Sequence, residues 1–284
     1  MVLIADSGST KTDWRVLRNG TEYAKFETSG LNPFYLKQKE IGLEVKKGAP
    51  PGLPLDEIRK IYFYGAGCST PEKKQVLSEG VKMVFPNAQM DVYSDLIGAA
   101  RALFKNTPGL VVILGTGTNT ASYDGERIIQ HIPALGYILG DEGSGASLGK
   151  ELIVAYLNHK LPQPLFEKFR NRYKPSVEEI KHSVYKEQRP NQFLASFTLF
   201  LSENMEDPYV HRLVYDGFKK LFEHQICRIE GWDNLKIRTT GSVAFYFQSI
   251  LSEVAGEFKT SIDKILKAPI TELISYHIGQ FHNH

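Results

Sequence analysis

Cysteine is scarce in this chain of 284 residues, which contains only two, Cys68 and Cys227. They lie far apart in the sequence. They show neither the paired spacing of a metal site nor the density of a disulfide framework. We therefore expect two reduced thiols and a cytoplasmic protein.

Long apolar runs are also missing. None approaches the roughly 20 residues that a membrane-spanning helix needs, and we expect no signal peptide, because no basic segment followed by a long apolar core opens the sequence. Neither sign of charge is in large excess, since the net charge is +2 at pH 7. This balance argues against nucleic acid or a membrane surface as a partner.

What the chain does contain is an ordinary globular composition, with 42% hydrophobic and 23% charged residues. Such a composition is ample for a hydrophobic core. A length of 284 residues corresponds to roughly two domains of about 150 residues each. We place the boundary at Thr107-Pro108-Gly109, which predicts domains over residues 1–107 and 108–284.

The most informative stretch lies near the N-terminus, where two apolar runs, 2–5 and 14–17, flank a short turn. The turn is rich in hydrogen-bonding groups: Asp6, Ser7, Ser9, Thr10, Lys11 and Thr12. The pattern predicts a β-hairpin. Gly8 allows close approach to a ligand, and successive N–H groups in such a turn can bind an anion. Asp6 is placed to hold a hydrated Mg²⁺ through its waters. A plain solvent-exposed turn is the alternative.

A second stretch repeats this pattern: the apolar run 110–114 leads into Gly-Thr-Gly-Thr-Asn-Thr at 115–120. Superposing Gly8 on Gly117 places Ser7 on Thr116 and Trp14 on Tyr123. Two strand–turn–strand units in one chain predict a duplicated domain with two phosphate-facing hairpins.

Paired hairpins of this kind resemble those of the actin-like ATPase superfamily. The motifs Asp-x-Gly-x-Thr-Lys-Thr at 6–12, Gly-Thr-Gly-Thr-Asn at 115–119 and Gly-Asp-Glu-Gly-Ser at 140–144 together resemble its N-acetylglucosamine kinase branch. That branch shares a family with the ATPases that activate benzoyl-CoA reductase and 2-hydroxyacyl-CoA dehydratase. The resemblance implies an α/β fold of two duplicated actin-like (ribonuclease H-like) domains with a cleft between them. It also implies ATP with Mg²⁺, and transfer of phosphate to a hydroxyl of an amino sugar such as N-acetylglucosamine or glucosamine.

Asp95 follows a predicted strand, 90–94, and opens a predicted helix. An aspartate there is often only an N-cap. Strand-to-helix junctions of α/β sheets also gather ligand sites, and the resemblance implies that Asp95 is the catalytic base.

The resemblance assigns further roles to individual residues. It implies phosphate binding by Ser7, Gly8, Ser9, Thr10, Lys11, Thr116, Gly117, Thr118 and Asn119, sugar binding by Asn32, Thr116, Tyr137 and Asp141, and adenosine binding by Gly241 and Ser242. Asn32 precedes Pro33 and therefore sits in a turn, which alone could explain it. Asp141 could merely complement a helix dipole. Tyr137 stands where many members carry Trp, which leaves the identity of the sugar open.

Local patterns predict several further elements. They are helices over 71–85, 146–159 and 209–229, strands over 128–132 and 235–240, and a last helix that starts at Ala268-Pro269. Thr70 is the expected N-cap of the first of these helices, with Pro71 at its first position. His277, His282 and His284 are expected in a solvated tail rather than in a metal site.

Other readings remain. The run 145–151 is a near miss for a P-loop, because it is one residue short and Glu151 replaces the Ser or Thr that binds Mg²⁺. An activator ATPase would need Cys68 or Cys227 to hold an iron–sulfur cluster. A third reading is a non-catalytic nucleotide or sugar sensor. The sequence leaves a homodimer open.

Overall fold

The computed structural model describes residues 1–174 and 176–281, and the chain divides into two compact units. The first contains Met1–Thr107, Gly125–Arg127 and the described residues from Ala268 on, and the second contains Pro108–Asp124 and Ile128–Lys267. The residues after Lys267 thus pack with the first unit although the chain reaches them from the second. The extents of the two duplicated domains stay a prediction.

The first unit is built on a five-stranded sheet with the order β3-β2-β1-β4-β5. Its strands are β1 (Val2–Ser7), β2 (Lys11–Arg18), β3 (Thr21–Ser29), β4 (Lys60–Gly65) and β5 (Gln89–Ser94). Strands β1 to β3 form an antiparallel meander, whereas β4 and β5 run parallel to β1. The carboxyl ends of β1, β4 and β5 therefore meet at one edge of the sheet.

The second unit repeats this topology in the order β8-β7-β6-β9-β10. Its strands are β6 (Gly109–Leu114), β7 (Thr118–Tyr123), β8 (Ile128–Ile132), β9 (Ile237–Thr240) and β10 (Ile262–Leu266). Again three strands are antiparallel and two are parallel to the first. The shared topology confirms the duplication that the two hairpins predicted.

The register of the predicted repeat was wrong. The last pair before the first turn is Ser7 with Thr12, whereas the last pair before the second turn is Leu114 with Thr118. Four residues lie between the members of the first pair and three between those of the second. Counted from these pairs, Gly8 corresponds to Gly115, because a single offset cannot hold across turns of different length.

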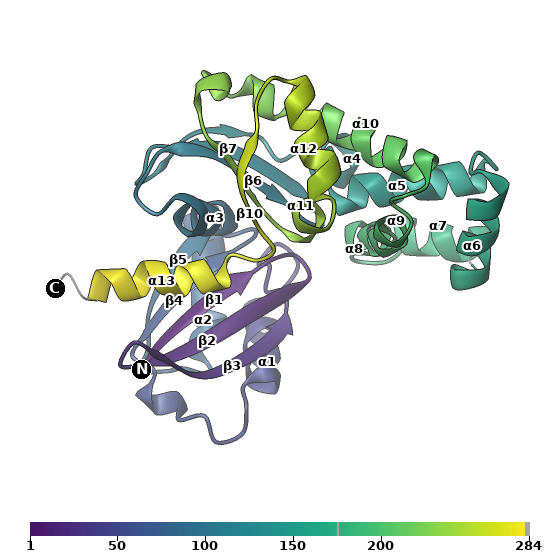
Figure 1. The fold of residues 1–284 in the computed structure, drawn as a ribbon. Helices are drawn as coiled ribbons and strands as arrows, with labels where there is room; N and C mark the ends of the chain where they lie inside the picture. The colour runs from purple at the N-terminus through teal and green to yellow at the C-terminus, as the bar shows by residue number, and fades with distance from the viewer. Residues whose placement is uncertain (175, 282–284) are drawn as a thin grey trace. The chain divides into compact units, whose positions relative to one another are not determined.

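Helices cover both faces of the first sheet. They are α1 (Gln38–Gly48), η1 (Leu55–Glu57), α2 (Pro71–Lys82), α3 (Asp95–Phe104) and α13 (Ile270–Phe281). On the α1 and α2 side, the buried Trp14 stacks on Phe26 with ring centroids 5.4 Å apart. On the other side, α13 packs against α3 and β1. Figure 1 shows this helix, at the yellow end of the chain, beside the purple strands.

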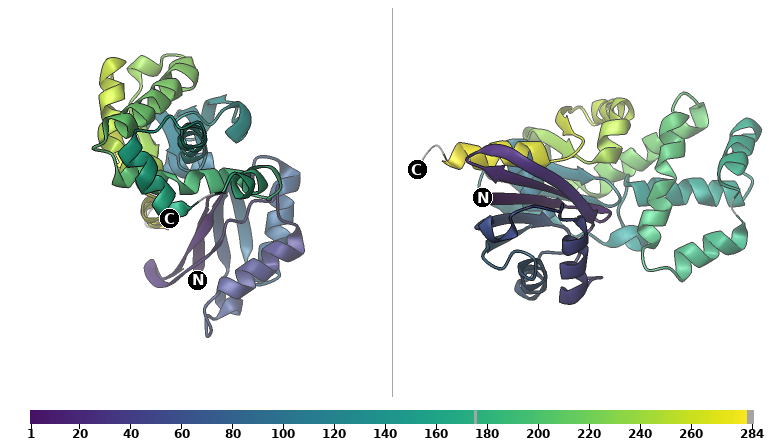
Figure 2. Two further views of the ribbon diagram at one scale, coloured as in Figure 1. Left: turned by 90° about the vertical axis from the view of Figure 1, so that its right-hand side faces the viewer. Right: turned by 90° about the horizontal axis from the view of Figure 1, so that it is seen from below.

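The second unit carries more helices. They are α4 (Gly136–Leu139), α5 (Gly145–Leu157), α6 (Gln163–Tyr173), α7 (Val177–Tyr185), α8 (Pro190–Ser196), α9 (Thr198–Glu203), α10 (Pro208–His224), η2 (Ile226–Arg228), η3 (Trp232–Asn234), α11 (Ser242–Tyr246) and α12 (Gln248–Glu257). Helices α8 and α9 pack against α5, α7 packs against α8, and Phe169 of α6 contacts Tyr156 of α5. Figure 2 shows the teal and green helices of this unit from two further directions. In the described part of the chain no helix is both long and apolar enough to cross a membrane.

The helix predicted over 209–229 was wrong in its extent. Helix α10 ends at His224, because Gln225 leaves helical geometry with φ −129° and ψ −61°. A short 3₁₀ turn, η2, follows it. The strand predicted over 128–132 is confirmed by β8, and the side chain of Thr70 caps α2 as expected.

The prediction that His277 lies in a solvated tail was also wrong. It lies in α13 and is 2% exposed. Its ring stacks on Tyr62 with centroids 3.9 Å apart, and its Nε2 lies 2.9 Å from the hydroxyl of Tyr64. His277 therefore anchors α13 to strand β4 of the first sheet. His282 and His284 lie outside the described residues.

We expect this histidine to make stability depend on pH. Burial, together with the positive charge of Arg101, lowers the pKa of His277 to about 4. Lys60 acts in the same direction, whereas Asp91 opposes it. An unfolded histidine titrates near 6.5, so the unfolded state binds the extra proton first. The stability that the neutral ring provides is complete above about pH 6.5 and is lost as the pH falls toward 4.

Urea unfolding of the wild type and of His277→Gln at pH 7.5 and pH 5.0 tests this expectation. The wild type should lose about 2 kcal/mol more than the variant between the two pH values. Other titrating groups contribute equally to both proteins and cancel in the comparison. An identical pH dependence in both proteins would contradict it.

Candidate functional site

The β1–β2 turn is held in place from within the first unit. Ser7 is buried, its hydroxyl lies 2.7 Å from that of Thr12, and it accepts a hydrogen bond of 3.1 Å from the N–H of Leu31. The N–H of Gly30 donates to the carbonyl of Thr10 at 3.0 Å. The hydroxyl of Ser7 thus organises the turn, and the residues after β3 support it.

Gly30 shows how closely the two segments approach. A Cβ atom at Gly30 would lie 2.5 Å from the carbonyl oxygens of both Gly8 and Ser9, closer than any real contact. Only glycine can therefore support the turn from this side. The Nζ of Lys11 pairs with Glu27 at 2.5 Å in an exposed position, so solvent screens this ion pair.

Three carboxylates gather beside this turn. Asp6 stands opposite Asp13 in the β1–β2 ladder. Asp95 is the first residue of α3 and follows β5, and its Oδ1 accepts a hydrogen bond of 2.9 Å from the N–H of Leu96. The N-cap of α3 is Ser94, so the reading of Asp95 as a mere cap was wrong. The parallel strands bring Asp6 and Asp95 to the same edge of the sheet.

The charges of this cluster perturb one another. Burial, reinforced by the negative charges of Asp95 and Asp13, raises the pKa of Asp6 to about 7, although Lys11 counteracts the shift. Burial also raises the pKa of Asp95 to about 6. Asp13 is partly neutralised by its ion pair with Arg15. Raised carboxyl pKa values at a strand-end junction mark a candidate active site.

Asn32 lies at the same edge. Its Oδ1 accepts a hydrogen bond of 2.9 Å from the N–H of Phe34, which closes the expected turn. A Cβ at Gly67, where φ is +78°, would lie 2.2 Å from this oxygen. Gly67 follows the end of β4, so the structure brings Asn32 to the edge where Asp6 and Asp95 lie.

In the second unit, the β6–β7 turn is bound to the start of α5. The N–H groups of Gly145 and Ala146 donate to the carbonyls of Gly115 and Thr116 at 2.8 and 3.0 Å. Thr118 is 3% exposed, and its hydroxyl donates to the carbonyl of Glu142 at 2.9 Å. The side chain of Thr118 therefore holds the turn in place, and a direct bond from its hydroxyl to a phosphate is not the role that this geometry favours.

Asp141 is buried in the α4–α5 loop, with a φ of 60° that non-glycine residues rarely adopt. Its Oδ1 accepts a hydrogen bond of 3.2 Å from the N–H of Thr118, and burial raises its pKa. Tyr137 lies on α4, partly buried, and its carbonyl accepts a hydrogen bond from Lys150. Asn119 lies on β7, where its Oδ1 is 2.6 Å from Nε2 of His131.

The turn between β9 and α11 reaches the same part of the second unit. A Cβ at Gly241, where φ is +128°, would lie 2.3 Å from the carbonyl oxygen of Leu114. Gly241 and Ser242 are thus next to the end of β6. The structure therefore brings together the turn 115–117, Asp141 and the predicted adenosine residues.

Asp13 and Gln225 are two residues of this arrangement that the sequence did not predict. Asp13 could have been found, because the length of the first turn places it opposite Asp6. Gln225 could not, since nothing in the apolar stripe of the helix predicted over 209–229 marks it. Its side chain connects β7 to Glu142, as described below.

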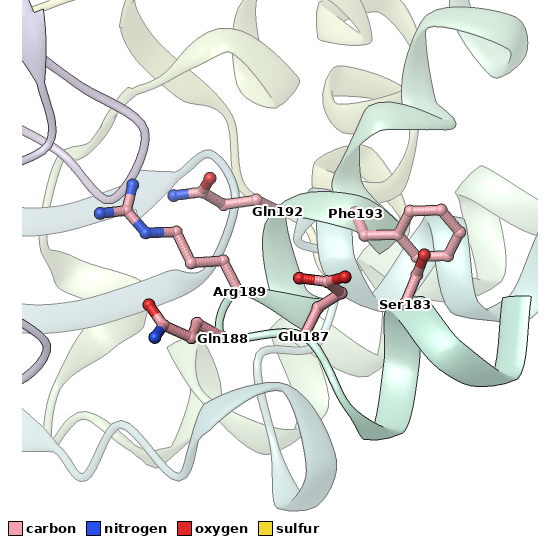
Figure 3. A pocket seen from close by; sticks show the side chains of 6 residues that line it. All are labelled: Ser183, Glu187, Gln188, Arg189, Gln192 and Phe193. Atoms are coloured by element: carbon pink, nitrogen blue, oxygen red, sulfur yellow. The ribbon is translucent and has the colours of Figure 1, made fainter. Parts of the chain in front are cut away.

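Elsewhere in the second unit, a pocket of about 410 Å³ lies between α7 and α8. It is lined by Ser183, Glu187, Gln188, Arg189, Gln192 and Phe193, none of which is a predicted site residue. Figure 3 shows Arg189 and Gln192 extending away from Ser183 and Phe193, so these groups do not converge on one ligand position.

The two cysteines lie in different units, and Cys68 follows Gly67 at the edge where Asp6 and Asp95 lie. Cys68 is 1% exposed, and burial raises the pKa of its thiol to about 12. A buried, protonated thiol is a poor ligand for a cluster shared with another chain. Cys227 lies in η2 of the second unit.

Solved structures resemble this chain along its whole length. A "putative N-acetylglucosamine kinase" from Porphyromonas gingivalis is 38% identical, with 99% of this chain and 100% of that chain covered and a TM-score of 0.94. A second protein so described, from Chromobacterium violaceum, is 16% identical, with coverage of 97% and 98% and a TM-score of 0.72. A ROK family glucokinase from Streptomyces griseus, in complex with glucose and AMPPNP, is 14% identical, with 97% of both chains covered and a TM-score of 0.58.

The last two similarities show the fold alone, whereas the first, at 38% identity over nearly all of both chains, shows the family. No protein-family model and no curated protein matches the sequence. The two units with one repeated topology agree with the fold that the sequence predicted. The chain belongs to the family of N-acetylglucosamine kinase-like proteins within the actin-like ATPase superfamily.

Proposed function

We propose that this protein is an ATP-dependent kinase that phosphorylates a hydroxyl of an amino sugar of the N-acetylglucosamine or glucosamine class. The observation that carries the proposal is the position of Asp95, a carboxylate with a raised pKa at the sheet edge where Asp6 and Asn32 also lie. The name of the 38% identical relative from Porphyromonas gingivalis supports the choice of sugar.

In this proposal Asp95 is the general base that accepts the proton of the sugar hydroxyl. Such a base typically contributes about 10²- to 10⁴-fold to the rate. Asp95 keeps its carboxylate in position through the N–H of Leu96. Asn32, Thr116 and Asp141, on turns and loops, bind the sugar ring together with Tyr137 on α4.

The phosphates of ATP bind to the two hairpin turns. The residues concerned are Ser7, Gly8, Ser9, Thr10 and Lys11 in the first unit and Thr116, Gly117, Thr118 and Asn119 in the second. Their contribution comes mainly from backbone N–H groups, because Ser7 and Thr118 use their hydroxyls to hold the turns. Gly241 and Ser242 bind the adenosine end.

The carboxylates fit a hydrated Mg²⁺ at Asp6. Burial and the charges of Asp95 and Asp13 raise the pKa of Asp6 to about 7, the response of a carboxylate with too little positive charge around it. A bound cation would supply that charge and would neutralise the phosphates during transfer. Asp6 would hold it through water.

A substrate panel tests the proposal. Purified protein with ATP and Mg²⁺ is incubated with N-acetylglucosamine, glucosamine, N-acetylmuramic acid or glucose, and ADP and sugar phosphate are both quantified. We expect an amino sugar to have a kcat/KM at least about 10-fold above that of glucose, since a site that hydrogen-bonds a substrate group rejects analogues that lack it. ATP hydrolysis that no sugar stimulates would contradict the proposal, and stoichiometric iron in anaerobically purified protein would favour the activator ATPase.

A further inference from the structure

A polar network that is buried at Gln225 joins three elements of the second unit. The hydroxyl of Thr120 on β7 donates to Oε1 of Gln225 at 2.9 Å, and Nε2 of Gln225 donates to a carboxylate oxygen of Glu142 at 2.8 Å. The other carboxylate oxygen lies 3.3 Å from Nδ1 of His224. Gln225 is 7% exposed; its bond to Thr120 is buried, and its bond to Glu142 is partly buried.

The chemistry of the partners fixes which way the amide of Gln225 points. A carboxylate only accepts hydrogen bonds, so the NH₂ group must face Glu142 and the carbonyl oxygen must face Thr120. Burial alone would raise the pKa of Glu142, but the hydrogen bonds from Gln225 and His224 lower it overall. An amide satisfies both partners here, whereas a carboxylate in its place would meet Glu142 with like charge.

Glu142 belongs to the loop that carries Asp141. The carbonyl of Glu142 accepts from the hydroxyl of Thr118, whose N–H in turn donates to Asp141. Gly143, the next residue of the loop, packs tightly against α10, since a Cβ there would lie 3.1 Å from the ring of Phe218. The loop thus takes its position from β7 and from the end of α10. Gln225, at the end of α10, is the side chain that bonds both to Thr120 of β7 and to Glu142 of the loop.

We propose that Gln225 is a positioning residue: by linking Thr120 to Glu142, it sets the place of the loop that presents Asp141 to the sugar. This rests on the proposed function. Gln225 touches no predicted substrate position and acts through Glu142. Its amide is required because it donates to one neighbour and accepts from the other.

The decisive variant is Gln225→Glu, assayed from pH 6 to pH 8.5. At the upper end the new carboxylate meets Glu142, and we expect KM for the sugar to rise about 10-fold or more with a smaller change in kcat, the scale of a lost hydrogen bond to a charged group. At lower pH the pair of carboxyl groups takes up one proton and can share it. KM should then return toward the wild-type value.

Other groups near Glu142 also carry charge. His224 faces it from α10, Asp141 lies beside it, and Lys150 of α5 acts on Asp141. Asp95, with its pKa of about 6, lowers turnover in acid in every variant. The ratio of the variant to the wild type at each pH removes the effects that both proteins share, such as that of Asp95, so the pH dependence that remains arises at Glu142 and its direct neighbours.

Gln130→Glu is the matched control. The side chain of Gln130 also makes two hydrogen bonds, to the carbonyl of Arg228 and from the N–H of Glu230, but it is only partly buried and both partners are backbone groups. Its KM ratio should stay near 1 at every pH. A Gln225→Glu ratio that is also near 1, or that does not vary with pH, would overturn the proposal.

Amide hydrogen exchange separates this result from the proposed function. Without any substrate, Gln225→Glu should lose protection at the N–H of Thr118 and over residues 144–146 at pH 8 and regain it at pH 6. Gln225→Leu, which cannot titrate, should lose protection equally at both pH values, and serves if the charged variant does not fold. If the wild-type protein phosphorylates no sugar but the two variants show this exchange pattern, the kinase proposal is refuted and the positioning of the loop by Gln225 stands. An unchanged exchange pattern would refute the positioning role.

Discussion

Replacing Asp95 with asparagine is expected to lower kcat by at least about 10²-fold, the lower end for a lost general base. The amide keeps the shape of the side chain and can still accept from the N–H of Leu96. It can also hydrogen-bond a sugar hydroxyl, so KM should change little. The wild-type rate should fall below about pH 6, where Asp95 takes up a proton. The measurement is steady-state turnover with the sugar that the substrate panel identifies.

The stability of Asp95→Asn should rise although its turnover falls. Because burial raises the pKa of Asp95 to about 6, its ionised form costs stability, and this cost appears as the pH rises from about 4 through 6. At pH 8 without Mg²⁺, Asp95→Asn should therefore melt above the wild type. Ser94→Ala is the control: it removes the true N-cap of α3 and should lower stability by about 1 kcal/mol without a 100-fold loss of turnover. Full turnover in a folded Asp95→Asn protein would remove Asp95 from the mechanism.

Gly149→Ala is expected to have the largest effect on stability, a loss of roughly 3 kcal/mol or more. Gly149 lies in α5, and a Cβ there would be 1.9 Å from the carbonyl oxygen of Leu194 in α8. Backbone must move to relieve this contact. In thermal denaturation the transition of this protein should fall by roughly 6–12 °C, at about 2–4 °C per kcal/mol.

Gly256→Ala provides the matched control. Gly256 lies in α12, and nothing is within 4 Å of the position of its Cβ. Alanine favours a helix over glycine by about 1 kcal/mol, so this variant should be slightly more stable than the wild type. If Gly149→Ala has the same melting temperature as the wild type, α5 and α8 can move apart without loss of stability, and the prediction is wrong.

The same contact explains the sequence that resembles a P-loop. Gly145 lies against the carbonyl of Gly115 and Gly149 against α8, so both glycines serve close packing. The spacing of small residues along α5 follows from the path of α8 across it. Phosphate binding is assigned instead to the turns before β2 and β7.

Local patterns were sufficient for the two hairpins and for the strand-to-helix junction at Asp95, because each depends on residues close together in sequence. The catalytic role of Asp95 stays a prediction. The register of the repeat was not predictable from matching glycines, since one turn is a residue shorter. Gln225 had no local signal at all: its partners Glu142 and Thr120 are 83 and 105 residues away. His277 and Tyr64 are separated by 213 residues, and only the folded chain brings them together.

The position of α13 has a consequence for biosynthesis. A ribosome makes strands β1 to β5 of the first unit before the second unit, yet it makes α13, the helix that covers Tyr62 and Tyr64, only after the second unit. Domains generally fold as units during synthesis, the N-terminal one first. Here the second unit is completed earlier, and one face of the first sheet stays uncovered on the nascent chain until translation reaches α13.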